Sequence, residues 1–223
     1  MKTSHSHTRT ARLRRAIGLF ILIGGTALAT SRVVSDDQTP GDGKKGDVDP
    51  AAKAAMEAWL KTGTPGEHHA HLKALAGKWK AVGRFRMSPD APWTESNSTS
   101  EATWILGGRF LQQKFTGDTV DEQMGRRFEG FGLIGYDNYS KHYTAIWTDN
   151  MSTMMLSAEG ACSSSGNEIT LEGRYKDPAT GRTKTFKWIY RVRNSTQYVL
   201  EAYETGPDGK EFKNMEIVHT RRK

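Results

Sequence analysis

Hydrophobic and polar residues follow two different periods along the chain, and the change falls at Gly77. Ahead of this glycine, apolar side chains recur every three or four positions, which is the spacing of an amphipathic helix. After it, apolar and polar residues alternate, so that Trp79 and Ala81 share one face of an extended segment while Lys78 and Lys80 share the other. The pattern predicts short helices followed by a domain built of strands.

Two short helices are predicted before the strands. Asp49 is suited to cap the first, whose apolar stripe includes Trp59 and which ends at Gly63. The second begins with Thr64–Glu67, which has the form of a capping box, and ends before the strands. We expect these helices to flank or plug one mouth of the strand-built domain.

The remaining sequence predicts about ten strands that form a single antiparallel, all-β domain. Turn-forming residues separate the strands at short intervals, and no helical segment interrupts them, so a parallel βαβ architecture is not expected. An unbroken meander with glycines on the apolar face, such as Gly83 and Gly173, favours an up-and-down barrel over a sandwich. The predicted strands are 77–87, 95–106, 109–116, 126–136, 142–149, 152–161, 168–175, 182–193, 197–205 and 211–221.

The segment 126–149 reads as a hairpin with an unusual first strand. Asp137 and Asn138 are typical turn residues, because their side chains bond to the nearby backbone. Glycines at 130, 132 and 135 would normally weaken a strand, so they indicate curvature or the close approach of a backbone or ligand. We expect Phe131 and Leu133 to face the inside of the barrel together with Trp147.

Charge divides the chain into an export segment and a nearly neutral domain. Residues 1–29 combine a basic start, a short apolar run and an A-x-A ending, which is typical of a secretory signal peptide. Removing their five positive charges from the formal net charge of +7 leaves +2. We therefore predict a signal peptide at 1–29, a disordered leader at 30–49 and a folded domain at 50–223.

The protein is expected to be periplasmic or secreted, and the weak charge gives no reason to expect nucleic acid as a partner. An uncleaved membrane anchor is the alternative for the first segment.

The single cysteine, Cys162, limits the available chemistry. One cysteine cannot form an intramolecular disulfide or a two-cysteine metal site. We expect it to be a small structural residue.

Several short motifs between residues 64 and 222 resemble those of a bacterial family known as domain of unknown function 1579. They are Glu67-His68, Leu75-Ala76-Gly77-Lys78-Trp79, Trp104-Ile105-Leu106-Gly107-Gly108-Arg109, Phe128-Glu129-Gly130, Gly135-Tyr136-Asp137-Asn138, Asp177-Pro178-x-x-Gly181 and Met215-Glu216-Ile217. The resemblance implies a lipocalin-like, calycin-type β-barrel. It implies no activity.

Aromatic residues on the apolar faces of the strands carry the main functional hypothesis. They are expected either to form a plain packed core or to line a cavity for a small hydrophobic or amphipathic ligand. In the second case Arg109, Asp149 or Glu216 would hold the polar end of the ligand. The candidate ligand-binding residues are Trp79, Trp104, Arg109, Phe131, Tyr136, Trp147, Asp149, Trp188, Tyr190 and Glu216.

Two other classes of function remain open. His68 and His71, with His142 or His219, would be an enzymatic or metal-binding set at the barrel mouth. Paired carboxylates drawn from Asp149, Glu159, Glu172 and Glu216 would be an acid and a base across the lumen.

The third class is a structural or protein-interaction module with a filled core. No serine lies in a nucleophile elbow, and the sequence indicates no cofactor. We assign no catalytic or metal-binding residue and expect ligand binding rather than catalysis.

Overall fold

The computed structural model describes residues 49–121, 125–206 and 208–223. The predicted signal peptide and nearly all of the predicted leader lie outside these residues. The helical elements are α1 (Pro50–Thr62), α2 (Glu67–His71) and the 3₁₀ helix η1 (Leu72–Leu75). The strands are β1 (Gly77–Phe85), β2 (Thr94–Ile105), β3 (Phe110–Asp121), β4 (Arg126–Asp137), β5 (His142–Asp149), β6 (Leu156–Cys162), β7 (Glu168–Lys176), β8 (Thr183–Asn194), β9 (Gln197–Thr205) and β10 (Glu211–Arg221).

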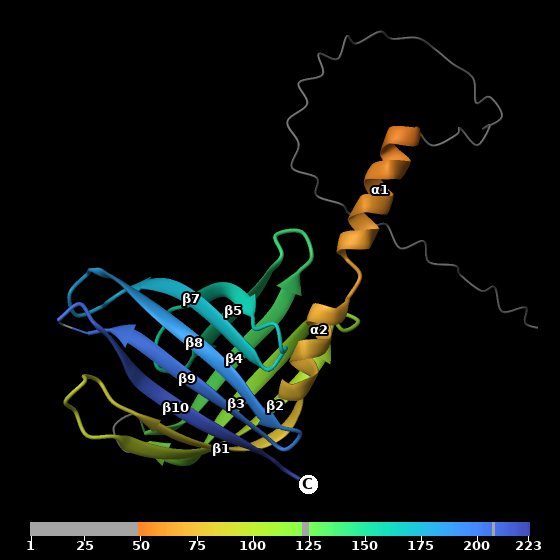
Figure 1. The fold of residues 1–223 in the computed structure, drawn as a ribbon. Coiled ribbons are helices and arrows are strands. Elements are labelled where there is room, and N and C mark those ends of the chain that lie inside the picture. The colour runs from red at the N-terminus through yellow and green to blue at the C-terminus, as the bar shows by residue number, and fades with distance from the viewer. Residues whose placement is uncertain (1–48, 122–124, 207) are drawn as a thin grey trace, which may run out of the picture. The chain divides into compact units, whose positions relative to one another are not determined.

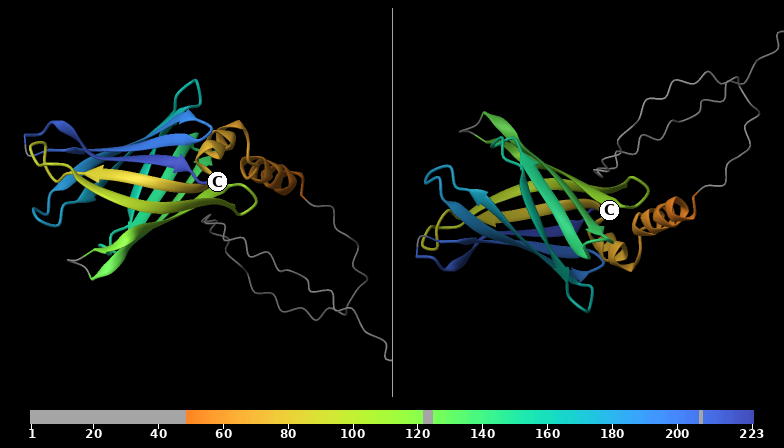
Figure 2. Two further views of the ribbon diagram at one scale, coloured as in Figure 1. Left: turned by 90° about the horizontal axis from the view of Figure 1, so that it is seen from below. Right: turned by 90° about the horizontal axis from the view of Figure 1, so that it is seen from above.

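The strands form a closed antiparallel barrel in which each pairs with its neighbours in sequence and β1 pairs with β10 (Figure 1). The closing seam joins Trp79 to Arg221 and Phe85 to Met215. The predicted up-and-down barrel is therefore confirmed. The C-terminus lies at the same end of the barrel as α2 in each view of Figure 2.

One mouth of the barrel, called here the covered mouth, is capped by α2 and η1. Leu72 and Leu75 are buried there, and the Trp79 indole donates a hydrogen bond to the Leu75 carbonyl at 2.9 Å. The Asn138 side-chain amide donates to the carbonyls of Thr62 and Thr64, both at 2.8 Å. The turn between β4 and β5 thus fixes the chain that enters the cap. The opposite end, which carries the β1–β2, β5–β6 and β7–β8 turns, is called the far mouth.

The first helix does not pack as predicted. Asp49 caps α1 by accepting from the Ala51 amide at 3.0 Å, in agreement with the sequence, but none of the helix residues is buried. Trp59 is 68% exposed, so its apolar stripe does not plug the barrel.

The second helix also begins differently from the prediction. The Thr64 hydroxyl bonds back to the Leu60 carbonyl, and α2 begins at Glu67. His69 Nδ1 accepts from the Gly66 amide instead, so the expected capping box from Thr64 is wrong.

Side chains alternate between the inner and outer faces of the wall as the sequence predicts, except in β4. Ile134 and Tyr136 belong to the core cluster, which places the intervening residues of the strand outside. Phe131 and Leu133 therefore lie on the outer face, and the prediction that they face the interior is wrong. Sequence alone did not settle this face, because apolar side chains and glycines alternate along the strand.

Aromatic rings from neighbouring strands pack against the glycines of β4. Gly132 pairs with Trp147 across the strands, and the Trp147 indole occupies the space in which a β-carbon at Gly130 would lie and packs closely against Gly132. On the outer face, the Phe110 ring lies against Gly135 in the same way. The glycines of β4 are therefore sites of close approach, as predicted, and the groups that approach them are side chains of neighbouring strands.

The loop before β6 is longer than predicted. Asp149 accepts from the Met151 amide at 3.0 Å, and the Ser152 hydroxyl accepts from the Met154 amide at 3.2 Å. These turns use the backbone of residues 150–155 locally, so the strand starts at Leu156 rather than at Ser152.

Candidate functional site

A buried polar group lies in the middle of the barrel interior. His219 on β10 is 1% exposed, and its ring stacks on Tyr198 of β9 with centroids 4.1 Å apart and planes 9° from parallel. Neither ring nitrogen of His219 has a hydrogen bond of normal geometry to any described residue. Buried polar groups of proteins nearly always have partners, so this histidine is exceptional.

Other uncharged polar groups lie near His219. The Gln113 side-chain amide donates to the Tyr198 hydroxyl at 3.3 Å. Ser98 and Ser100 are buried on β2. The Ser100 hydroxyl lies near the Tyr198 phenol but makes no hydrogen bond of normal geometry with a residue that the structure describes. Together His219, Tyr198, Gln113, Ser98 and Ser100 form what we call the interior polar set.

Burial keeps His219 uncharged. Loss of hydration lowers the pKa of this imidazole to about 3, and a weak contact with the Ile217 backbone opposes the shift. The ring is therefore neutral at neutral pH, with one nitrogen that donates and one that accepts. Burial likewise raises the pKa of the Tyr198 phenol, so this side chain also remains uncharged.

Aromatic rings surround the interior polar set. Phe115 lies 6.2 Å from His219 and 6.2 Å from Trp147, measured between ring centroids. The Trp79 ring meets Tyr198 edge to face at 4.8 Å. A polar group within apolar walls is the arrangement by which proteins orient amphipathic small molecules.

Charged side chains of the inner face lie toward the two ends of the barrel, and each is engaged. At the covered mouth, Arg221 lies over the Trp79 ring at 4.1 Å and donates to the Ala76 carbonyl at 2.9 Å. Toward the far mouth, Glu204 contacts Lys184 at 3.3 Å and also accepts from Tyr175. Arg221, Lys184 and Glu204 thus already have hydrogen-bond or ion-pair partners within the protein.

The structure brings together six of the ten predicted ligand-binding residues. All six belong to the core or pack against it from the inner wall: Trp79, Trp104, Tyr136, Trp147, Trp188 and Tyr190. Phe131 lies outside, as described above. The three residues proposed to hold a polar end are separated from one another.

Each of these three residues has a local role. Arg109 is exposed in the β2–β3 turn, where it donates to the Leu106 carbonyl at 3.0 Å. Asp149 accepts from the Trp147 indole at 2.9 Å and so holds that ring in place. Glu216 lies on the outer face, 3.0 Å from Arg84, so it does not reach the interior as expected.

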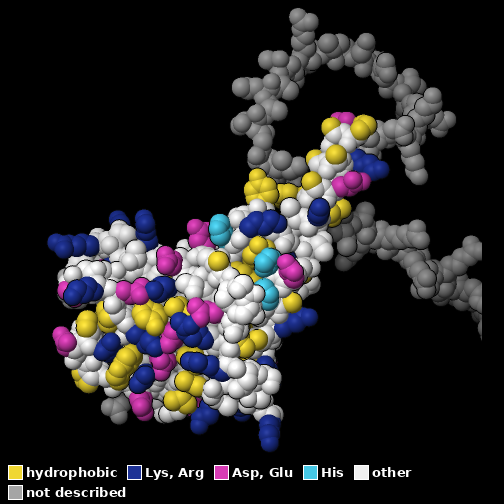
Figure 3. Space-filling view, in the orientation of Figure 1, with side chains coloured by type: hydrophobic (Ala, Val, Ile, Leu, Met, Phe, Trp, Pro, Cys, Tyr) yellow, Lys and Arg dark blue, Asp and Glu magenta, His cyan; other side chains and the backbone are white. Residues whose placement is uncertain are grey.

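Glu216 belongs to a network of ion pairs on the outer wall. Lys213 donates to both Glu216 and Glu201, and Arg191 bonds to Glu201 and Glu168. Burial alone would raise the pKa of Glu201, but the bonds from Lys213 and Arg191 outweigh it and lower that pKa. Side chains of both signs are mixed over this side of the molecule in Figure 3.

A small cleft of about 330 Å³ lies beside the covered mouth. His71 Nδ1 lies 2.7 Å from the Tyr143 hydroxyl, which also donates to the His68 carbonyl at 3.0 Å. His68 stacks on Tyr136, and its ring nitrogen is 3.8 Å from Glu67, beyond hydrogen-bond reach. Burial raises the pKa of the neighbouring Cys162 thiol, which disfavours the reactive thiolate.

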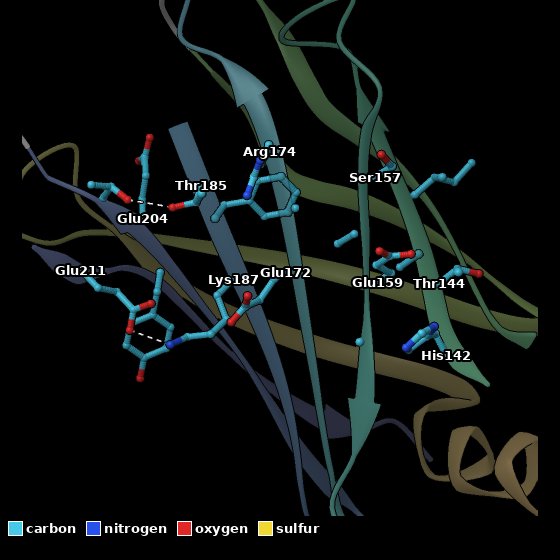
Figure 4. A pocket seen from close by; sticks show the side chains of 18 residues that line it. His142, Thr144, Ser157, Glu159, Glu172, Arg174, Thr185, Lys187, Glu204 and Glu211 are labelled. Carbon is cyan, nitrogen blue, oxygen red and sulfur yellow. Dashed lines mark hydrogen bonds and ion pairs between the residues drawn. The ribbon is translucent and has the colours of Figure 1, made fainter. Parts of the chain in front are cut away.

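A larger groove of about 850 Å³ crosses the outer wall from β5 to β10 (Figure 4). Glu159 and Glu172 lie directly opposite each other across β6 and β7, and Lys187 pairs with Glu211 at 2.6 Å. Most of the residues that line the groove are polar, and most of these polar side chains are exposed.

The alternative sites considered from the sequence are not assembled. Glu159, Glu172 and Glu216 face outward while Asp149 faces inward, so no pair of them meets across the lumen. His142 lines the outer groove, and His219 lies in the interior. In the residues that the structure describes, no group of three His, Cys, Asp or Glu side chains could hold a metal ion.

Sequence reasoning missed most of the interior polar set. The sequence marks His219 only as a possible third metal ligand, and it does not mark Tyr198, Gln113, Ser98 or Ser100 as site residues. The available signal was the alternation in β10, which puts His219 on the same face as Ile217.

The sequence matches the family described as "Protein of unknown function (DUF1579)" over residues 64–221. This stretch covers the cap and the whole barrel. The chain belongs to the DUF1579 family. The resemblance noted in the sequence is therefore confirmed, and α1 lies outside the matched region. No curated protein matches the sequence.

Solved structures support the barrel fold of this DUF1579 protein. Rv2717c from M. tuberculosis is similar with a TM-score of 0.53 and 15% identity, over 72% of this chain and 100% of that one. The S-type phycobiliprotein lyase CPES from Guillardia theta gives a TM-score of 0.50 and 11% identity, over 71% and 99%. At such low identity these likenesses show a shared calycin-like barrel and nothing of activity. None of the helices in the described part of the DUF1579 protein is long and apolar enough to cross a membrane.

Proposed function

We propose that the barrel binds a small amphipathic ligand in its interior, with His219 as the main polar contact. The observation that carries this proposal is the buried imidazole whose two nitrogens have no hydrogen bond of normal geometry to any residue in the described part of the chain. Leaving a buried polar group unpaired costs about 1–3 kcal/mol. A ligand that satisfies the imidazole recovers this cost on binding.

The surroundings of His219 support the same function. Phe115, Trp147 and Trp79 offer apolar contact around the polar set, and lipocalin-type barrels are suited to enclosing one small molecule. The rival function is a structural module whose core is filled and whose histidine is paired only with ordered water. An enzymatic site at the covered mouth has less support, because the carboxylate of Glu67 lies 3.8 Å from the His68 ring, and no carboxylate among the described residues lies within hydrogen-bond reach.

Native mass spectrometry of the full chain purified from its own host tests the proposal. We expect a co-purified small molecule in a one-to-one complex, and its loss in the His219→Phe variant. The Thr220→Ser variant is the matched control, because Thr220 is the next residue of β10 and faces outward. A protein that carries no small molecule, and binds none from a panel of eight-carbon amphiphiles, would leave the filled core as the better description.

Export is part of the proposed function. The basic, apolar and small-residue regions of residues 1–29 support removal of this segment during passage across a membrane. The mass of the mature protein from its host tests this directly. A chain that retains its first 29 residues would contradict a cleaved signal peptide.

A further inference from the structure

We infer that the interior site selects an uncharged ligand whose polar group both donates and accepts a hydrogen bond, such as an alcohol or a primary amide, and discriminates against carboxylates. This inference rests on the proposed function and specifies the chemistry of the same site. It depends on which polar groups the middle of the barrel contains, and on where the charged groups of the inner face lie.

Among the described residues, the buried hydrogen-bonding side chains in the middle of the barrel are all neutral. The buried polar side chains there are the imidazole of His219 and the hydroxyls of Ser98 and Ser100. Tyr198 and Gln113 already bond to each other at 3.3 Å. A neutral imidazole presents one donor and one acceptor, which match the hydroxyl of an alcohol or the two ends of an amide.

A carboxylate would find no free positive partner at this position. The inner-face cations of the described barrel include Arg221 near the covered mouth and, toward the far mouth, Lys184 and Arg126, which donates to the Asn150 carbonyl at 2.6 Å. Arg221 bonds to the carbonyls of Ala76 and Ser195, both at 2.9 Å, and Lys184 contacts Asp177 at 2.6 Å and Glu204 at 3.3 Å. Burying an anion without a partner costs far more than burying a neutral group, so the site disfavours acids.

His219 resists the change that would admit an acid. A protonated imidazole could pair with a carboxylate, but burial holds the pKa of His219 near 3. Its ring neighbours are Tyr198 and Phe115, neither of which carries a negative charge that would favour protonation. The site thus remains a donor–acceptor pair over the neutral pH range.

Matched ligands test the inference. We would titrate 1-octanol, octanamide and octanoate into the full chain at neutral pH by calorimetry, and follow the ¹⁵N shifts of the His219 ring in histidine-labelled protein. We expect the alcohol and the amide to bind at least about tenfold more tightly than the acid. A tenfold ratio corresponds to about 1.4 kcal/mol, which is less than the cost of burying an unpaired carboxylate. Only the neutral ligands should shift the two ring nitrogens in opposite senses.

Two variants assign the selectivity to His219. His219→Phe should weaken octanol binding by roughly tenfold and leave the weak octanoate binding unchanged, because only the hydrogen bonds are removed. His219→Gln, which keeps a donor and an acceptor, should retain most of the octanol affinity. The Thr220→Ser variant should behave as the native protein.

The outcomes separate the two proposals. Octanoate that binds as tightly as octanol would overturn the inferred ligand class and leave interior binding intact. Failure of all three ligands to bind the native protein would overturn the proposed function itself. The native protein decides between these results, so the comparison does not depend on how well the variants fold.

Discussion

On the outer wall of the barrel, Glu201 is buried and accepts hydrogen bonds from Arg191 and Lys213, whereas on the inner wall the still more deeply buried His219 has no hydrogen bond of normal geometry to a described residue. The two residues lie on neighbouring strands of one sheet. The outer network includes Arg84, so it spans the seam where the last strand meets the first. The difference teaches that the fold pairs charged side chains where they link neighbouring strands of the outer wall. In the interior polar set it leaves His219 unpaired, at a cost in stability.

Removal of Glu201 is expected to have the largest effect. In Glu201→Ala, Lys213 and Arg191 would lose their shared, buried partner. We expect a loss of about 2–3 kcal/mol in the free energy of unfolding, below the usual cost of breaking a fully buried pair because the two cations are partly exposed. Urea denaturation followed by tryptophan fluorescence measures this loss.

A second pair on the same wall provides the control. Lys187 and Glu211 lie 2.6 Å apart, but Glu211 is half exposed. The Glu211→Gln variant should change stability by less than about 0.5 kcal/mol. Equal effects of the two substitutions would mean that burial does not distinguish the outer network from ordinary surface pairs.

Acid should weaken the inner wall before the outer one. The pKa of His219 is lowered to about 3 from the usual 6.5, so below about pH 6.5 the unfolded chain binds a proton that the folded chain does not. Stability should therefore fall by about 1–2 kcal/mol between about pH 6.5 and 5. Burial also lowers the pKa of His69, which contributes in the same sense.

The outer carboxylates respond at lower pH. The pKa values of Glu201 and Glu216 are lowered, so their contribution is present above the usual value of 4.5 and is lost as the pH falls below it. Urea titrations across both pH ranges measure the two effects separately. In His219→Phe the slope above about pH 5 should shrink to the part due to His69, and an unchanged slope would contradict a buried neutral His219.

Apart from the Glu211→Gln control, the smallest expected effect is a gain in stability. At neutral pH, His219→Phe removes unpaired polar atoms and keeps an aromatic ring on Tyr198, so we expect unfolding to become harder by about 1 kcal/mol. His219→Leu provides a second variant if the larger ring is poorly accommodated. A loss of more than about 1 kcal/mol in both variants would indicate that the histidine stabilises the empty barrel.

The sequence predicted the barrel because strand alternation is a local property. The order and number of the strands followed from period-two segments and their turns, and the Asp137 side chain does accept from the Tyr139 amide at 2.7 Å. The inner face of β4 was not predictable in this way. It is decided by Trp147, which lies over the glycines from the neighbouring strand.

The candidate site depended on contacts that the sequence does not display. Glu216 looked like a free carboxylate, but its partner Arg84 lies across the closing seam, far away in the chain. The lack of partners around His219 is a property of the assembled interior. Aromatic positions could be predicted from the pattern, whereas the pairing of polar groups required the three-dimensional structure.

The Trp147 ring over Gly130 also constrains which substitutions this protein can accept during evolution. Any side chain at Gly130 would overlap the indole, and a smaller residue at position 147 alone would leave a void. We expect each replacement alone to destabilise the fold, and a larger residue at 130 together with a smaller one at 147 to destabilise it less. The two positions are thus epistatic, and the route between their alternative pairings passes through a less stable intermediate.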